Sequence, residues 1–118
     1  MQDEPGSFPR TPRIRRSTSD RLRDALAELS GGTARIASHN ETAWASITFA
    51  GTRHRLEMLF EGEDGVAAGE AFIEALPEHE FAIPRQLVAD ACVTEIDHSL
   101  VPQPRMAVSV ELLLLEDA

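Results

Sequence analysis

The stretch from Thr33 to Gly62 reads TARIASHNETAWASITFAGTRHRLEMLFEG, and it decides the fold. Apolar and polar side chains alternate along much of it, which is the pattern of strands with one buried face. His39-Asn40 and Ala50-Gly51 interrupt the alternation with residues that tolerate the left-handed backbone of tight turns. The stretch therefore predicts three antiparallel strands joined by two-residue turns, a meander.

The two predicted turns set a register that the side chains support. Ala43 then stands opposite Ile36 on one side and Met58 on the other, and the next row is also apolar. A slip of one residue would send every side chain to the other face. Turn position and hydrophobic alternation thus agree on one arrangement, with these residues facing the core.

The opposite face of the predicted meander is polar with a single aromatic residue. It carries Arg35, Trp44, Arg53, Arg55 and Glu57. Arg35 is expected beside Trp44, where a cation–π contact contributes about 0.5–1 kcal/mol at an exposed site. Two interpretations stay open: a solvated sheet face, or a surface that binds a ligand or a partner.

Helical patterns flank this stretch on both sides. Ser17 begins a run with apolar residues at helical spacing that ends at Gly31-Gly32, which predicts a short amphipathic helix. A second helix is expected from Glu63 or Asp64 to Pro77, with acidic residues at its positive end. Its many small residues predict close packing on a sheet.

The C-terminal part predicts two further strands. The sequences LVADACVTEID (87–97) and RMAVSVELLLLED (105–117) alternate, and a proline-containing turn joins them. Pairing Ala91 with Val110 places Asp90 directly opposite Glu111. Like charges in that position are unfavourable, so these carboxylates are expected to need a cation, a raised pKa or solvent.

The predicted fold class is α+β: helix, three-stranded antiparallel meander, helix and β-hairpin, with both helices on one face of a five-stranded antiparallel sheet. Residues 17–118 form the single domain, and residues 1–16 form a flexible arm. In coarse topology and charge this element order resembles the class I type III secretion chaperones. That resemblance implies a small, acidic, dimeric protein.

Charge is distributed unevenly along the chain. The net charge is −9, yet the arm carries Arg10, Arg13, Arg15 and Arg16. An acidic protein is poorly suited to bind nucleic acid, because neutralising phosphates needs a basic surface. Only the basic arm could bind nucleic acid. The acidic N-terminus, the lack of a long apolar run and the single cysteine together predict a cytoplasmic protein.

No residue pattern indicates catalysis or metal binding. His39, His54, His79 and His98 share no usual metal-ligand spacing, and Cys92 lacks a nucleophile motif. The sequence therefore predicts no catalytic residue, no metal and no cofactor, with Cys92 as a small packed side chain.

Three classes of function remain open. The favoured class is a non-catalytic protein-interaction module that forms a homodimer, or binds another protein, through or near the open sheet face. The first alternative is a small-molecule binding protein or enzyme that uses the arginine and carboxylate groups of that face. The second is a regulatory protein whose basic arm contacts nucleic acid. The candidate binding residues are Arg35, Trp44, Arg53, Arg55, Glu57, Asp90 and Glu111.

Overall fold

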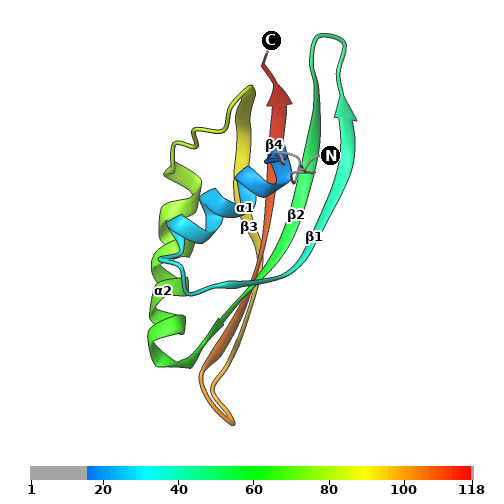
Figure 1. The fold of residues 1–118 in the computed structure, drawn as a ribbon. Coiled ribbons are helices and arrows are strands. Elements are labelled where there is room, and N and C mark those ends of the chain that lie inside the picture. The colour runs from blue at the N-terminus through cyan, green and yellow to red at the C-terminus, as the bar shows by residue number, and fades with distance from the viewer. Residues whose placement is uncertain (1–15, 118) are drawn as a thin grey trace, which may run out of the picture.

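A computed structural model describes residues 16–117, in which two helices lie against one sheet (Figure 1). Arg10, Arg13 and Arg15 of the predicted arm lie outside the described residues. The elements in chain order are α1 (Thr18–Leu29), β1 (Arg35–Ala45), β2 (Ala50–Glu61), α2 (Gly62–Ala75), the 3-10 turn η1 (Leu76–Glu78), β3 (Gln86–Ser99) and β4 (Arg105–Glu116).

The sheet has four antiparallel strands in the order β1-β2-β4-β3. It consists of two hairpins, β1–β2 and β3–β4, which join where β2 pairs with β4, for example at Leu56 and Val110. The central strands are β2 and β4, and the edge strands are β1 and β3. The α+β class with an antiparallel sheet is confirmed, whereas the five-stranded sheet and the three-stranded meander are wrong.

The meander fails at both predicted turns. Strand β1 continues through His39 and Asn40, and the chain reverses instead at residues 46–49. Ser46 closes this loop: its backbone N–H donates to the carbonyl of Phe49 at 2.8 Å, and its hydroxyl accepts from the Phe49 N–H at 3.1 Å. A two-residue turn would need positive φ at Ala50, which is unfavourable for a side chain with a Cβ. The resemblance to type III secretion chaperones rested on the meander and is withdrawn with it.

The register of both hairpins differs from the prediction, and β-bulges change the size of the difference along β3. Ala43 pairs with Thr52, six positions away from the expected Met58. Asp90 pairs with Leu113, two positions away from the expected Glu111. Because side chains alternate with a period of two, the even shift at Ala43 and at Asp90 keeps these residues on their predicted faces. The bulges at residues 89 and 94 make the shift odd in the rest of β3.

Both helices cover the same face of the sheet (Figure 1). Helix α1 begins with a capping box, in which Ser17 and Asp20 satisfy each other's backbone N–H groups. Its Leu22 and Leu26 are fully buried against the sheet. The core beneath the helices is built from Leu56, Met58, Phe60, Phe72, Met106, Val108, Val110, Leu112 and Leu114. Neither helix is long and apolar enough to cross a membrane, within the residues that the structure describes.

Helix α2 packs closely on the sheet at Gly69. A Cβ at this position would lie 2.5 Å from Cε of Met106 and 2.9 Å from Cγ of Phe60. Such distances are shorter than van der Waals contact, so only glycine fits between the helix and these side chains.

Candidate functional site

The seven candidate binding residues all lie on the strands, on the face that points away from the helices. Strand β1 contributes Arg35 and Trp44, β2 contributes Arg53, Arg55 and Glu57, β3 contributes Asp90, and β4 contributes Glu111. Along β2 and β4, residues on this face alternate with buried residues, whose side chains point to the helix-covered face. We call this surface the open face. That it binds anything stays a prediction.

Glu111 lies at the centre of the open face and is paired with arginines rather than with Asp90. Nη1 of Arg53 lies 2.7 Å from Oε2 of Glu111, and Nε of Arg55 lies 3.4 Å from Oε1. The expected carboxylate pair does not form, because the register places Cys92 opposite Glu111. The Glu111 carboxylate is therefore neutralised within its own sheet.

Trp44 and Arg35 lie at opposite ends of β1, so their predicted contact is wrong. Trp44 pairs with Gly51 and Arg35 pairs with Leu59. Nine residues of strand separate them by roughly 30 Å, from a rise of about 3.3 Å per residue. Trp44 instead joins an apolar row with Leu115 and Leu87.

The middle of the open face is hollowed. A depression of about 430 Å³ has a mainly polar lining, drawn from all four strands. The residues that line it are Ser38, Asn40, Arg55, Leu56, Glu57, Thr94, Glu95, Ser109, Val110 and Glu111. The volume is within the range of small-ligand sites, although most such sites are more apolar.

Arg16 is the one residue of the predicted arm that the structure describes. It pairs with Asp24 on α1. Together with Thr18, Arg21, Pro84, Arg85 and Gln86 it lines a second hollow, of about 440 Å³. Tertiary folding thus brings Arg85, distant in sequence, near the basic start of the domain.

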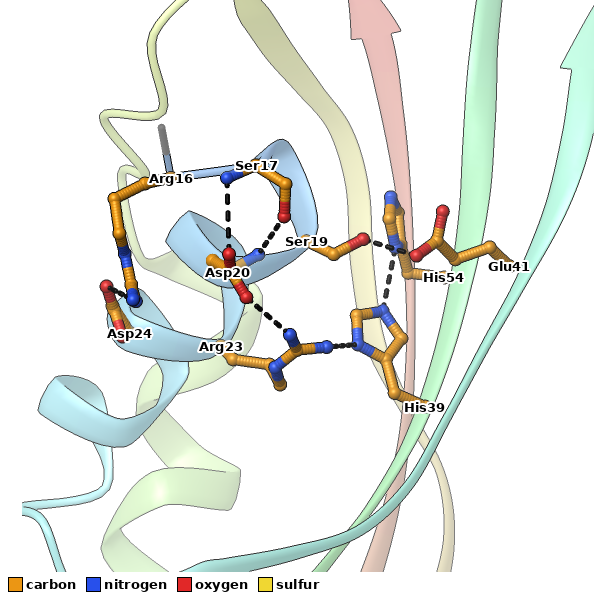
Figure 2. A network of polar contacts seen from close by, with 9 residues as sticks. All are labelled: Arg16, Ser17, Ser19, Asp20, Arg23, Asp24, His39, Glu41 and His54. Atoms are coloured by element: carbon orange, nitrogen blue, oxygen red, sulfur yellow. Dashed lines mark hydrogen bonds and ion pairs between the residues drawn. The ribbon is translucent and has the colours of Figure 1, made fainter. Parts of the chain in front are cut away.

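A chain of hydrogen bonds runs from α1 into the core on the helix-covered side (Figure 2). Nη1 of Arg23 lies 2.7 Å from Nδ1 of His39, and Nε2 of His39 lies 2.9 Å from Nδ1 of His54. Arginine can only donate, so Nδ1 of His39 accepts and its proton sits on Nε2. That proton is donated to His54, whose own proton is then on Nε2. His54 Nε2 is buried without a partner among the described residues.

The surroundings of both histidines favour the neutral imidazole. Burial lowers the pKa of His39, and the Arg23 cation lowers it further. Burial also lowers the pKa of His54, which is only 1% exposed, while the Glu41 carboxylate acts in the opposite direction. Taking a charged imidazole out of water is costly, and the attraction of the nearby Glu41 carboxylate is smaller than that cost.

His39, Glu41 and His54 bring three possible metal-ligand atoms within 4.8 Å of one another. This cluster was not predicted from the sequence, because its residues have neither the helical nor the loop spacing of common metal sites. The signal was His39-x-Glu41, a spacing of two that puts both side chains on one face of a strand. The hydrogen bonds oppose ligation, since a proton lies between the rings and Arg23 places a cation beside His39. The expected absence of a metal stays a prediction.

Cys92 lies on the open face opposite Glu111 and is partly buried. Burial raises the pKa of its thiol, and the carboxylates of Asp90 and Glu111 raise it further. Since the thiolate is the reactive form, this environment makes Cys92 a poor nucleophile at neutral pH.

Comparisons with known proteins bear on the fold alone. No protein-family model matches the chain, and no curated protein matches it. A chain in the solved structure "Virion of native gene transfer agent (GTA) particle" has a similar fold, with a TM-score of 0.54 and 15% sequence identity. The match covers 84% of this chain and 92% of that chain. The two chains thus share an α+β fold.

Proposed function

We propose that this chain is a non-catalytic subunit of a protein assembly, and that it self-associates through its open face. The observation that carries the proposal is the one-sided arrangement of the helices, which leaves four long strands uncovered on the other side. Antiparallel sheets tolerate solvent on one face, but a surface that combines Trp44 with exposed Leu87 is typical of an interface.

The two hairpin tips offer further apolar contact points. Ile47 and Phe49 are exposed at the β1–β2 loop, and Leu100 and Val101 are exposed at the β3–β4 loop. These loops lie at opposite ends of the elongated sheet (Figure 1). Exposed apolar side chains gathered at such tips favour contacts with neighbouring subunits.

The fold likeness supports the same proposal. The similar chain belongs to a virion particle, in which protein–protein contacts hold the components together. A protein of this fold can therefore serve as a component of a large assembly. The single cysteine favours assembly in a reducing compartment such as the cytoplasm.

The mass of the full chain in solution tests the proposal. Light scattering and native mass spectrometry are expected to show species larger than the 12.9 kDa chain, with a population that rises with concentration. A monomer at every concentration up to about 1 mM, the limit of weak but specific association, would contradict the proposal.

The hollow on the open face favours a second candidate function. Its polar lining, which includes Arg55 and Glu111, suits a small polar ligand. Native mass spectrometry of the same sample separates the two candidates. A stoichiometric small molecule on a monomeric chain would favour ligand binding, whereas a ligand-free oligomer favours the assembly subunit.

A further inference from the structure

We infer that the open face pairs with the open face of a second copy of this chain, across a two-fold axis that runs parallel to the strands between β2 and β4. This inference rests on the proposed function and adds the surface and its geometry. A two-fold interface requires a surface that is complementary to itself. The rows of side chains across the four strands meet that requirement.

The geometry of the axis determines which strands meet. A rotation about an axis along the strands, between the two central ones, sets β1 against β3 of the second copy and β2 against its β4. Position along the strands is unchanged by this rotation. We call the residues that pair side by side across the four strands a row. Each row therefore faces the same row of the second copy, with the order of the strands reversed.

The apolar row is complementary to itself under this rotation. It reads Trp44, Gly51, Leu115 and Leu87 from β1 to β3. Trp44 then faces Leu87 of the second copy, whose side chain is 55% exposed in the single chain. Gly51 faces Leu115 of the second copy, so a large side chain meets a position without one.

The charged residues are also complementary. Arg35 faces Asp97 of the second copy, since both belong to the row of Leu59 and Ala107. Glu61 faces Arg105, and Arg55 faces Glu111, in the same way. Each contact occurs twice by symmetry. Opposite charges across an interface mainly fix the register and exclude wrong arrangements.

The remaining rows bring no like charges together. The facing pairs are Thr42 with Asp90, Arg53 with Leu113, Asn40 with Cys92, Ser38 with Glu95, Glu57 with Ser109, and Leu59 with Ala107.

The alternative two-fold axis runs across the strands and is unfavourable. It sets each strand on itself in the opposite direction. With this axis at the row of Arg55, Arg55 and Glu111 each face the same residue of the second copy, and Asp90 faces Glu95 of the second copy. The distribution of charge thus selects the axis that runs along the strands.

The area is sufficient for a specific dimer. Four strands about 4.8 Å apart, with about eleven residues at a rise of about 3.3 Å, present roughly 700 Å² per chain. A stable interface of standard size buries about 600–1,000 Å² per partner. The open face therefore has to be used almost in full.

Charge reversal at one facing pair tests the geometry. Arg35 and Asp97 are both exposed on edge strands, so reversing either charge leaves the core unchanged. Arg35→Glu alone, or Asp97→Arg alone, brings like charges together twice. Each is expected to weaken self-association about tenfold at low salt. An equal mixture of the two variants restores association, because every facing pair is again opposite in sign.

Glu70→Arg, on the exposed surface of α2, is the matched control for charge reversal and is expected to associate as the wild type does. Single variants that associate normally, or a mixture that stays as weak as its components, would overturn the two-fold geometry. The wild type would still associate in that case, so the proposed function would stand.

A thiol cross-link gives an independent test. Packed sheets lie about 10 Å apart, so a bismaleimide of about that length joins Cys92 to Asn40→Cys of the second copy. The expected product is a covalent dimer that forms only with Asn40→Cys. Neither the wild type nor Glu70→Cys forms it, because their thiols do not face each other. Equal cross-linking of the Asn40→Cys and Glu70→Cys variants would contradict the arrangement.

Discussion

Nε2 of His39 lies 2.9 Å from Nδ1 of His54 beneath helix α1, and this contact joins the edge strand β1 to the core (Figure 2). Arg23 extends the contact to α1, since it hydrogen-bonds both His39 and Asp20. One polar contact of α1 with the sheet, beside the apolar contacts of Leu22 and Leu26, therefore depends on the protonation state of two imidazoles. An apolar contact in the same place would not depend on pH.

The histidine pair predicts that the protein is less stable in mild acid. Folding lowers the pKa of both rings below their ordinary 6.5. The unfolded chain then binds more protons below about pH 6.5, so stability is fully present above that pH and is lost as pH falls through the folded pKa values. Urea unfolding at pH 7.5 and pH 5.5 measures the difference. His54→Leu is expected to lose most of it, whereas His98→Gln, at an exposed position, keeps it. Equal stability of the wild type at both pH values would contradict the prediction.

Removal of the Arg23 guanidinium is expected to let His39 adopt either neutral tautomer. Without this donor, Nδ1 of His39 no longer has to accept, and either ring nitrogen can carry the proton. Because Arg23 is 36% exposed, the expected loss for Arg23→Met is only about 1 kcal/mol of unfolding free energy. Nitrogen chemical shifts of the ring report the tautomer. Arg21→Met, on the same helix, is the control, and an unchanged His39 spectrum in Arg23→Met would contradict the hydrogen-bond chain.

Alanine substitutions at two glycines of α2 are expected to have different effects on stability. Gly69→Ala places a methyl group against Met106 and Phe60 and is expected to destabilise the fold by about 1–3 kcal/mol. Gly65→Ala meets its nearest heavy atom only at 3.4 Å, so the better helix propensity of alanine is expected to leave stability unchanged or raised by up to about 1 kcal/mol. Thermal unfolding of the two variants checks the contrast, and similar melting temperatures would show that α2 does not pack at Gly69.

Cys92 is expected to react slowly with iodoacetamide at pH 7.4. Its thiol pKa is raised by burial and by the carboxylates of Asp90 and Glu111. Asp90→Asn removes one of these carboxylates, so a larger fraction of thiolate and a faster reaction are expected. Glu70→Gln, far from the thiol on α2, serves as the control. The rate is followed by mass spectrometry, and a wild-type rate equal to that of a free cysteine would refute the prediction.

Trp44→Ala is expected to separate stability from association. Trp44 lies outside the main core, so the unfolding free energy of the monomer is expected to change by about 1 kcal/mol or less. Self-association is expected to weaken markedly, because Trp44 faces Leu87 of the second copy twice in the dimer and tryptophan is enriched among the interface residues whose truncation costs about 2 kcal/mol or more. Urea unfolding of dilute monomer and light scattering measure the two effects. A variant that unfolds, or that associates as well as the wild type, would contradict the role given to Trp44.

The sequence by itself determined which residues of the two central strands face which side of the sheet. Alternation in the segments that became β2 and β4 assigned Met58 and Val108 to the core, and it assigned Arg53 and Glu111 to the opposite face. The bounds of α1 also follow from local signals, because Ser17 caps its N-terminus and Gly31-Gly32 follows its C-terminus. These features depend on neighbours within a few residues, so they can be predicted from one chain.

Only the tertiary structure decided the number of strands, their register and their order. Alternation has a period of two, so a slide of six residues at Ala43 or of two at Asp90 leaves the face of the residue unchanged and cannot be detected from the pattern. The β-bulges of β1 and β3 also appear only in the tertiary structure. The pairing of β2 with β4 joins residues about fifty positions apart, such as Leu56 and Val110. The His39–His54 contact follows from the same register. Such contacts depend on the packing energy of the whole sheet, which no local signal in the sequence reports.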